Sequence, residues 1–248
     1  MPEEKNIKLI LEYDGSCYHG WQRQVGLTTV QEVLEEKIGT MTGETVNVIA
    51  SGRTDAGVHA LHQVANFKTR THLAPATLKK GLNALLPEDI FIKQAAFVPM
   101  DFNSRYNAKS KAYEYRILNR KEPDLFLRSY TWYIAAVLNL ENMGECLSQL
   151  LGRHDFSSFK SSGSGIINPV REMTKADLTG PADGLLRFLF EADGFMRHMV
   201  RNIIGTVAEV GRGKITVDEF VDIFHSRDRK KAGLKAPPQG LFLKMVKY

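Results

Sequence analysis

The chain has 248 residues, of which 43% are hydrophobic, so it can form one large domain or two smaller ones that share a core. Cys17 and Cys146 lie far apart and outside any CxxC or Cys/His zinc spacing, which favours a reducing compartment. The N-terminus is polar and no apolar run follows it, so we expect a soluble, cytoplasmic protein without a membrane partner. The net charge of +5 is compatible with a nucleic-acid partner and does not establish one.

Residues 1–105 are predicted to form an N-terminal half that mixes strands and amphipathic helices. Alternating apolar and polar side chains predict strands, and apolar side chains at helical spacing predict helices. A capping box begins at Thr29 before the first helix, and Pro75 begins the second. The expected order is strand, helix, two strands, helix and strand, at residues 7–13, 30–41, 46–50, 63–69, 75–86 and 90–97.

Residues 106–248 are predicted to form a C-terminal half, which follows a polar connection. We expect the Ser/Gly-rich stretch 157–165 to be a long, mobile active-site loop. The longest helix is predicted at 196–210, with an apolar stripe on one face and basic residues sharing another side. The other predicted elements are strands at 109–118, 130–134, 170–178, 185–192 and 241–246, and helices at 140–151 and after a capping box at 216–219.

The two halves show no internal sequence repeat, and each combines strands with a few amphipathic helices. This pattern predicts an α+β fold with mostly antiparallel pairing. Basic residues gather in three places, and a solvated surface is the ordinary explanation for such a cluster. The clusters are Arg105, Lys109, Lys111, Arg116, Arg120 and Lys121; then Arg197, His198, Arg201, Arg212 and Lys214; then Arg229, Lys230, Lys231 and Lys235 within residues 227–235.

Asp55 is the first candidate for chemistry, because it lies on a short glycine-bounded loop between two predicted strands. Gly52 and Gly57 allow positive φ and leave room for another molecule's backbone. Arg53 is near enough in sequence to lie beside the carboxylate and favour its ionised form. An ionised carboxylate can act as a nucleophile or a base, and an aspartate here can equally be a turn residue that bonds its own backbone.

A second loop, residues 16–24, interleaves aromatic residues with polar donors. This combination suits stacking on RNA bases and contacts with RNA phosphates. Trp21, Gln22 and Arg23 are therefore candidates for substrate binding. A tryptophan in a loop is also commonly a packed anchor, so both roles stay open for Trp21.

Six sequence blocks, in the same order along nearly the whole chain, resemble the A-type tRNA pseudouridine synthases. The most specific is Gly52-Arg53-Thr54-Asp55-Ala56-Gly57-Val58-His59. One block alone is a weak signal, whereas six in register form a strong one. The other five are Tyr13–Ser16 with Gly20–Gln24, Lys111–Arg116, Gly152–Phe156, Phe195–Asn202 and Gly240–Leu243.

The resemblance implies the pseudouridine synthase fold, in which two similar α/β halves share a long, mostly antiparallel mixed sheet. Helices pack on that sheet, and the catalytic cleft lies between the halves. The resemblance assigns Asp55 as the nucleophile and Arg53 as its partner or as a phosphate contact. Tyr113 would lie on the face of the target base, with Leu241 as an apolar wall of the pocket. Arg201 would either orient the carboxylate or bind the RNA backbone.

The implied activity is that of an isomerase, an intramolecular transferase that converts uridine to pseudouridine. The implied substrates are uridines at positions 38, 39 and 40 of the tRNA anticodon arm, which must be flipped out before reaction. The resemblance also implies a homodimer whose subunits both touch one tRNA. Because the overall reaction is neither redox nor hydrolysis, no cofactor is required and no metal is expected.

Two other functions compete with this assignment. Asp55, His59 and His62 lie close together and are acceptable metal ligands, although their spacing matches no established ligand pattern. A non-catalytic RNA-binding protein could be built on the same basic clusters and loops. The intact set of Asp55, Arg53 and Tyr113 favours the enzyme over both alternatives.

Overall fold

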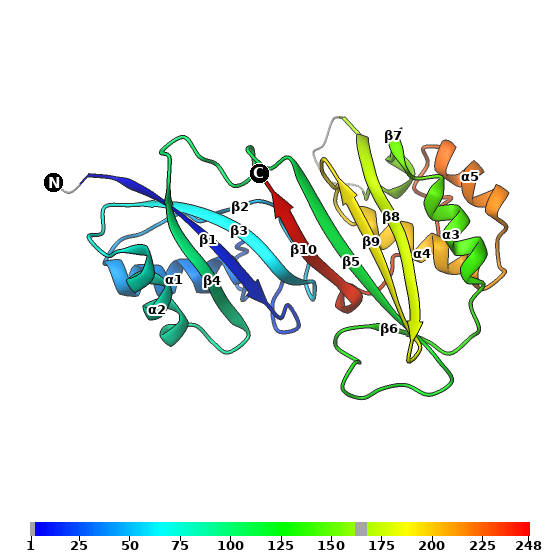
Figure 1. Cartoon of the computed structure of the whole chain (residues 1–248), viewed down its shortest axis with the longest axis horizontal. Coiled ribbons are helices and arrows are strands. Elements are labelled where there is room, and N and C mark those ends of the chain that lie inside the picture. Colours follow the sequence, from blue (N-terminus) through cyan, green and yellow to red (C-terminus); the bar gives the residue numbers. More distant parts are fainter. Residues whose placement is uncertain (1–2, 162–167) are drawn as a thin grey trace. The chain divides into compact units, whose positions relative to one another are not determined.

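The structure is a computed structural model that describes residues 3–161 and 168–248. These residues form five α-helices and a mixed sheet of ten strands, which confirms the predicted α+β class (Figure 1). The strands are β1 (Lys5–Tyr13), β2 (Ile49–Ala50), β3 (His59–Thr69), β4 (Ile90–Val98), β5 (Ser110–Asn119), β6 (Trp132–Ile134), β7 (Gly152–Asp155), β8 (Val170–Ala182), β9 (Leu185–Ala192) and β10 (Leu241–Lys247). The α-helices are α1 (Val30–Thr42), α2 (Pro75–Leu85), α3 (Leu140–Ser148), α4 (Met199–Gly211) and α5 (Val217–His225), and the 3-10 helices are η1 (Ser157–Phe159) and η2 (Pro238–Gly240).

The chain folds into two compact units, Met1–Lys109 with Leu243–Tyr248, and Ser110–Phe242. The predicted division after residue 105 differs from this, because the end of the chain returns to the first unit. The backbone N–H of Lys109 donates to the carbonyl oxygen of Lys247 over 2.9 Å. The hydroxyl of Tyr248 donates to the carbonyl oxygen of Ser104 over 2.7 Å. These bonds hold the last residues against the first unit.

In the first unit, β1 is the middle strand and pairs antiparallel with β3 and with β4. Its alternate residues Ile7, Leu9 and Leu11 are completely buried, as the period-two pattern predicts. Helices α1 and α2 pack side by side, and α2 also packs against β4 (Figure 1). Strand β2 has only two residues, paired with β3, where the sequence pattern predicts five. The loop that carries Asp55 therefore joins a very short strand to a long, well-packed one.

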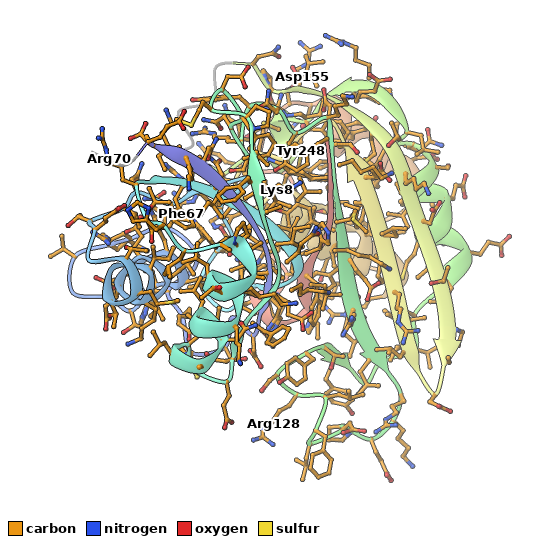
Figure 2. The ribbon with its side chains drawn as sticks, turned by 60° about the vertical axis from the view of Figure 1, so that its left-hand side comes forward. Lys8, Phe67, Arg70, Arg128, Asp155 and Tyr248 are labelled. Atoms are coloured by element: carbon orange, nitrogen blue, oxygen red, sulfur yellow. The ribbon has the colours of Figure 1, made fainter. Side chains whose placement is uncertain are left out.

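In the second unit, β9 lies between β5 and β8, and all three strands are antiparallel. Strand β7 pairs with β8, and β6 pairs parallel with β5. Helices α3, α4 and α5 contact one another, and α3 packs against β8 (Figure 1). The connection of residues 120–131, between β5 and β6, extends away from these strands, with Arg128 at its outer end in Figure 2.

Helix α4 differs from the predicted helix with a basic side. It begins at Met199, so Arg197 and His198 precede it, and every residue in it except Glu209 is buried. The expectation that the basic residues of the second cluster share one side of this helix is therefore wrong, because only Arg201 of them lies within α4. The physical reason is that α3, α5, η1 and β5 all pack against this helix, which also has the small residues Gly205, Ala208 and Gly211 for close approach.

The stretch predicted as a mobile loop is partly ordered and packed. Ser157–Phe159 forms the 3-10 helix η1, in which Ser158 and Phe159 are buried. The hydroxyl of Ser158 donates to the carbonyl oxygen of Ile223 in α5 over 2.7 Å. This contact ties the start of the stretch to the helical layer, and the rest of the predicted loop, at 162–165, lies outside the described residues.

Local sequence rules predict the helix ends well. Gly43 caps α1 with φ of +72°, and α5 begins with the complete Thr216–Glu219 capping box. The helix predicted at 140–151 instead ends at Ser148, and Gly152 begins strand β7, which the pattern did not predict. A φ of +97° at Gly152 turns the chain out of the helix direction.

Candidate active site

Asp55 lies in the loop 51–58 between β2 and β3, and its side chain is half-buried. The backbone N–H of Val58 donates to the carbonyl oxygen of Asp55 over 3.1 Å, and Gly57 has φ of +76°. Asp55 thus begins a tight turn that needs a glycine two residues later. The backbone of the turn therefore positions Asp55 just before the start of β3, whose first residues are buried.

Arg53 does not form the expected pair with Asp55. Its side chain is exposed, and within residues 3–161 and 168–248 it has no hydrogen-bond or ion-pair partner. The side chain of Arg53 faces solvent, whereas Asp55 is half-buried. The guanidinium of Arg53 is therefore available to an external anion.

Four buried polar side chains support the loop, and sequence reasoning assigned none of them to the site. The hydroxyl groups of Tyr13 and Thr54 are hydrogen-bonded over 2.8 Å. The amide of Gln63 donates to the carbonyl oxygen of Gly52 over 2.9 Å, and the hydroxyl of Ser51 donates to Gln63 over 2.7 Å. Burial raises the pKa of Tyr13 to about 12, so its hydroxyl stays protonated at neutral pH. A tyrosine and a glutamine at inward positions of strands were the available signal for this network.

The loop of residues 15–24 packs directly against the Asp55 loop. The backbone N–H of Trp21 donates to the carbonyl oxygen of Thr54 over 3.1 Å. The N–H of Gly57 donates to the carbonyl oxygen of Tyr18 over 3.3 Å. A side chain at Gly15 would lie 2.1 Å from the carbonyl oxygen of Val58, which explains the glycine there. The two loops therefore form one backbone-to-backbone unit.

Within this second loop, the three candidate RNA contacts differ in position. Trp21 is only 2% exposed, and its ring centroid lies 6.1 Å from that of Tyr13, so it is a packed anchor. Gln22 is half-buried. The side chain of Arg23 is 52% exposed and forms an ion pair with Glu35 of α1. Only Gln22 and Arg23 thus offer polar atoms toward solvent.

In the second unit, Tyr113 lies on β5 opposite Phe190 of β9 and is 7% exposed. The ring of Phe195 contacts it edge-on, with centroids 5.0 Å apart and planes at 80°. Tyr115, two residues on, is completely buried, and its hydroxyl donates to the carbonyl oxygen of Pro237 over 2.8 Å. The two tyrosines share one face of the strand, as predicted.

Arg201 and Leu241 are both buried, at 6% exposure. The Nε of Arg201 donates to the carbonyl oxygen of Ala236 over 2.8 Å, and the N–H of Ala236 donates back to the carbonyl oxygen of Arg201 over 3.0 Å. This reciprocal pair anchors the segment that leads to Leu241. Such burial suits an internal role for Arg201 better than contact with an RNA backbone. Burial raises the pKa of Tyr115, and the nearby charge of Arg201 opposes that rise.

The structure does not bring the alternative metal ligands into a site. The Nδ1 of His59 accepts a hydrogen bond from the N–H of Gly15 over 3.0 Å, so it cannot also donate to Asp14, 3.1 Å away. The Nδ1 of His62 is buried without a partner, and desolvation lowers the pKa of its ring. Across residues 3–161 and 168–248, no three His, Cys, Asp or Glu side chains are grouped so that they could hold a metal ion.

No helix in the part of the chain that the structure describes is long and apolar enough to cross a membrane.

The family model for "tRNA pseudouridine synthase" matches residues 9–107 and 147–248. A tRNA pseudouridine synthase A from Thermoanaerobacter sp. (strain X514) is 49% identical over 98% of this chain and 100% of its own length. Proteins of the same name from Acetivibrio thermocellus and Clostridium acetobutylicum are 47% and 44% identical, each over 98% of this chain and 100% of its own length. By these matches, which include the Asp55 loop and the segments around Arg201 and Leu241, the chain belongs to the tRNA pseudouridine synthase family.

Proposed function

We propose that this tRNA pseudouridine synthase uses Asp55 as its catalytic carboxylate, and that it acts on uridines 38, 39 and 40 of the anticodon arm. The observation that carries the role of Asp55 is its placement on a turn held by two backbone hydrogen bonds to the neighbouring loop and by a buried polar network. A reacting group held this firmly loses little orientational freedom on reaching the transition state.

The reaction makes demands that a carboxylate meets. The bond from C1′ of the ribose to N1 of the base breaks, and a bond from C1′ to C5 forms. The proton leaves C5, and N1 is protonated in the product, so atoms balance without an oxidant, a reductant or water. Asp55 would act by attacking C1′, by attacking C6 of the base or by removing a ribose proton.

The other residues take supporting roles in this proposal. Arg53, exposed and without a partner in the described residues, would pair with a phosphate next to the flipped nucleotide. Tyr113 would stack on the uracil, with its hydroxyl near C5 to help remove the proton, and Leu241 would form an apolar wall. Arg201 would hold the segment before Leu241 through Ala236. Gln22 and Arg23 would contact the RNA, while Trp21 keeps their loop in place.

The proposal extends to the assembly and its location. We infer a cytoplasmic homodimer in which both subunits contact one tRNA. Size-exclusion chromatography with light scattering tests the homodimer. A protein that is monomeric both with and without tRNA would contradict it.

Tritium release from C5-labelled tRNA tests the activity, since isomerisation replaces the C5–H bond with the C5–C1′ bond. Three anticodon-arm substrates, each with its single uridine at position 38, 39 or 40, test the positions. All three should release tritium, whereas a fourth substrate with uridine at 32 alone should not. A wild-type protein that binds tRNA and releases no tritium from any substrate would be a binding protein instead.

A further inference from the structure

A cavity of about 230 Å³ lies between the end of β7 and the end of α5, within the second unit. We call it the β7–α5 cavity. No residue so far assigned to catalysis contributes to it, although its three strand residues belong to the Gly152–Phe156 block that resembles the family. Figure 2 labels one lining residue, Asp155, and Figure 1 shows β7 and α5 in the same unit. The lining residues are Arg153, His154, Asp155, Phe224, His225 and Arg227.

The carboxylate of Asp155 in this cavity is already used. One of its oxygens accepts a hydrogen bond from the N–H of Ser157 over 2.9 Å. The other lies 3.3 Å from the Nε of Arg227. Arg227 itself has φ of +56°, an uncommon conformation for a residue with a side chain. Asp155 therefore fixes Arg227 through Nε and leaves its terminal nitrogens available.

Several donors around the cavity have no acceptor. In the described ranges, Arg153 has no hydrogen-bond or ion-pair partner, and the two Nη atoms of Arg227 have none either. Glu172 lies opposite Arg153 in the β7–β8 register, but no ion pair joins them. The ring of His225 stacks on Phe224 with centroids 5.4 Å apart. Two guanidinium groups, those of Arg153 and Arg227, thus line the cavity with one carboxylate, that of Asp155, which already has hydrogen-bond and ion-pair partners. This excess of donors favours an anionic ligand.

The walls of the cavity are held in place by packing. Phe224 is buried and forms part of an aromatic cluster with Phe156 and Phe159. The ring of His154 contacts Phe224 edge-on, and its Nε2 donates to the carbonyl oxygen of Leu151 over 2.7 Å. The aromatic walls are therefore already ordered, which lowers the entropic cost of binding, whereas the side chains of Arg153 and Arg227 are exposed.

We propose that the β7–α5 cavity binds one phosphate group of the tRNA backbone, with Arg153 and the terminal nitrogens of Arg227 donating to its oxygens. The inference rests on the proposed function, since it takes tRNA as the ligand. Planar guanidinium groups match phosphate oxygens in pairs, and such contacts position an RNA without reading its sequence. The cavity would therefore act as a positioning subsite for the tRNA, separate from the reacting nucleotide.

The test is tRNA binding as a function of salt for the double variant Arg153→Gln/Arg227→Gln. Loss of one phosphate contact should reduce the slope of log K against log salt by about 0.7 to 0.9. At 0.1 M salt this corresponds to roughly five- to eightfold weaker binding. The rate at saturating tRNA should be unchanged.

The matched control is Lys175→Gln/Arg187→Gln, which removes two exposed positive charges from β8 and β9 of the same unit. It should change affinity less than twofold.

Equal losses in the double variant and its control would show a general charge effect and overturn the subsite, as would an unchanged slope in the double variant. The single variant Arg153→Gln removes no contact within the described residues, so it should fold even if the double variant does not. Its tRNA binding can then be measured instead. It should give a partial loss in the same direction.

Inorganic phosphate provides a probe that is independent of catalysis. It should shift the NMR signals of the Arg153 and Arg227 guanidinium groups in the wild type. If it does so while the tRNA slope is unchanged in the double variant, the cavity takes free phosphate, and the RNA assignment is wrong. If the wild type makes no pseudouridine but the slope still falls in the double variant, the phosphate subsite stands and the proposed function fails.

Discussion

Gly20 lies directly against the backbone of Asp55. A side-chain carbon built on Gly20 would be 3.0 Å from the carbonyl carbon of Asp55 and 2.5 Å from the carbonyl oxygen of Thr54. Both distances are shorter than van der Waals contact, and the obstructing atoms are backbone. The position of the candidate catalytic residue is thus set in part by the absence of a side chain in the neighbouring loop.

Replacing Gly20 by alanine should therefore damage activity more than stability. The added methyl group must push the Asp55 loop away, and a displacement of about 1 Å in a catalytic group can reduce the rate by about a hundredfold. Gly26→Ala is the control, because Gly26 lies in the same connection between β1 and α1 at a similar φ of +75°, with nothing within 4 Å. It should keep nearly full activity. Single-turnover rates and melting temperatures of both variants measure the difference, and equal activity in the two would contradict this account.

The sequence predicts helices and strands best where the residues that determine them are close together in the chain. The capping box at Thr216 and the glycine cap at Gly43 are complete in the chain itself, and the structure confirms both. The prediction for helix α4 fails for the opposite reason. Its apolar stripe does not reveal that segments distant in sequence also cover its polar side. In the candidate site, Asp55 stands out by its motif. The support from Tyr13 and Gln63 requires the pairing of β1 with β3, which one sequence does not show.

Asp55→Asn should abolish tritium release while tRNA binding stays within a few-fold of the wild type. Asparagine keeps the shape of the side chain but removes the negative charge that acts as nucleophile or base. Filter binding measures affinity, and tritium release measures the reaction. The assignment fails if the variant retains more than a few per cent of the wild-type rate.

Arg53→Gln should weaken tRNA binding and lower its salt dependence, without loss of stability. Its guanidinium is exposed and has no partner in the described residues, so the folded protein loses no internal contact. Removal of one phosphate contact should lower the slope of log K against log salt by about 0.7 to 0.9. A lower melting temperature with an unchanged slope would instead give Arg53 a structural role.

Gly205→Ala tests the segment that α4 holds before Leu241. A side-chain carbon on Gly205 would lie 1.6 Å from the carbonyl oxygen of Leu234, so the segment must move. This movement should break the hydrogen bonds between Ala236 and Arg201, and we expect a loss of about 2–4 kcal/mol of stability, as for other buried steric and hydrogen-bond defects. Gly144→Ala in α3, with nothing within 4 Å, should be neutral or stabilise by about 0.5–1 kcal/mol. Urea denaturation of both variants measures these changes, and similar stabilities would contradict the packing described.

Tyr113 allows stacking and proton transfer to be separated. Its ring lies against Phe195 and is almost completely buried, so packing is the competing explanation for its presence. Tyr113→Phe keeps the ring and its edge contact but removes the hydroxyl. Tyr113→Leu removes the ring as well. If the hydroxyl takes part in removing the C5 proton, the Phe variant should lose about 10²- to 10⁴-fold in rate with little change in tRNA affinity.

We expect that outcome, because the Phe variant keeps the edge contact with Phe195 and removes only the hydroxyl. If only stacking matters, the Phe variant should be near wild type, and the Leu variant should lose roughly ten- to a hundredfold, as stacking energies of about 1–3 kcal/mol imply. Melting temperatures must be measured beside the rates. A Leu variant that melts far below the wild type, together with a fully active Phe variant, would assign Tyr113 to the core of the second unit. A Phe variant that is slow but melts like the wild type would place the hydroxyl in the reaction.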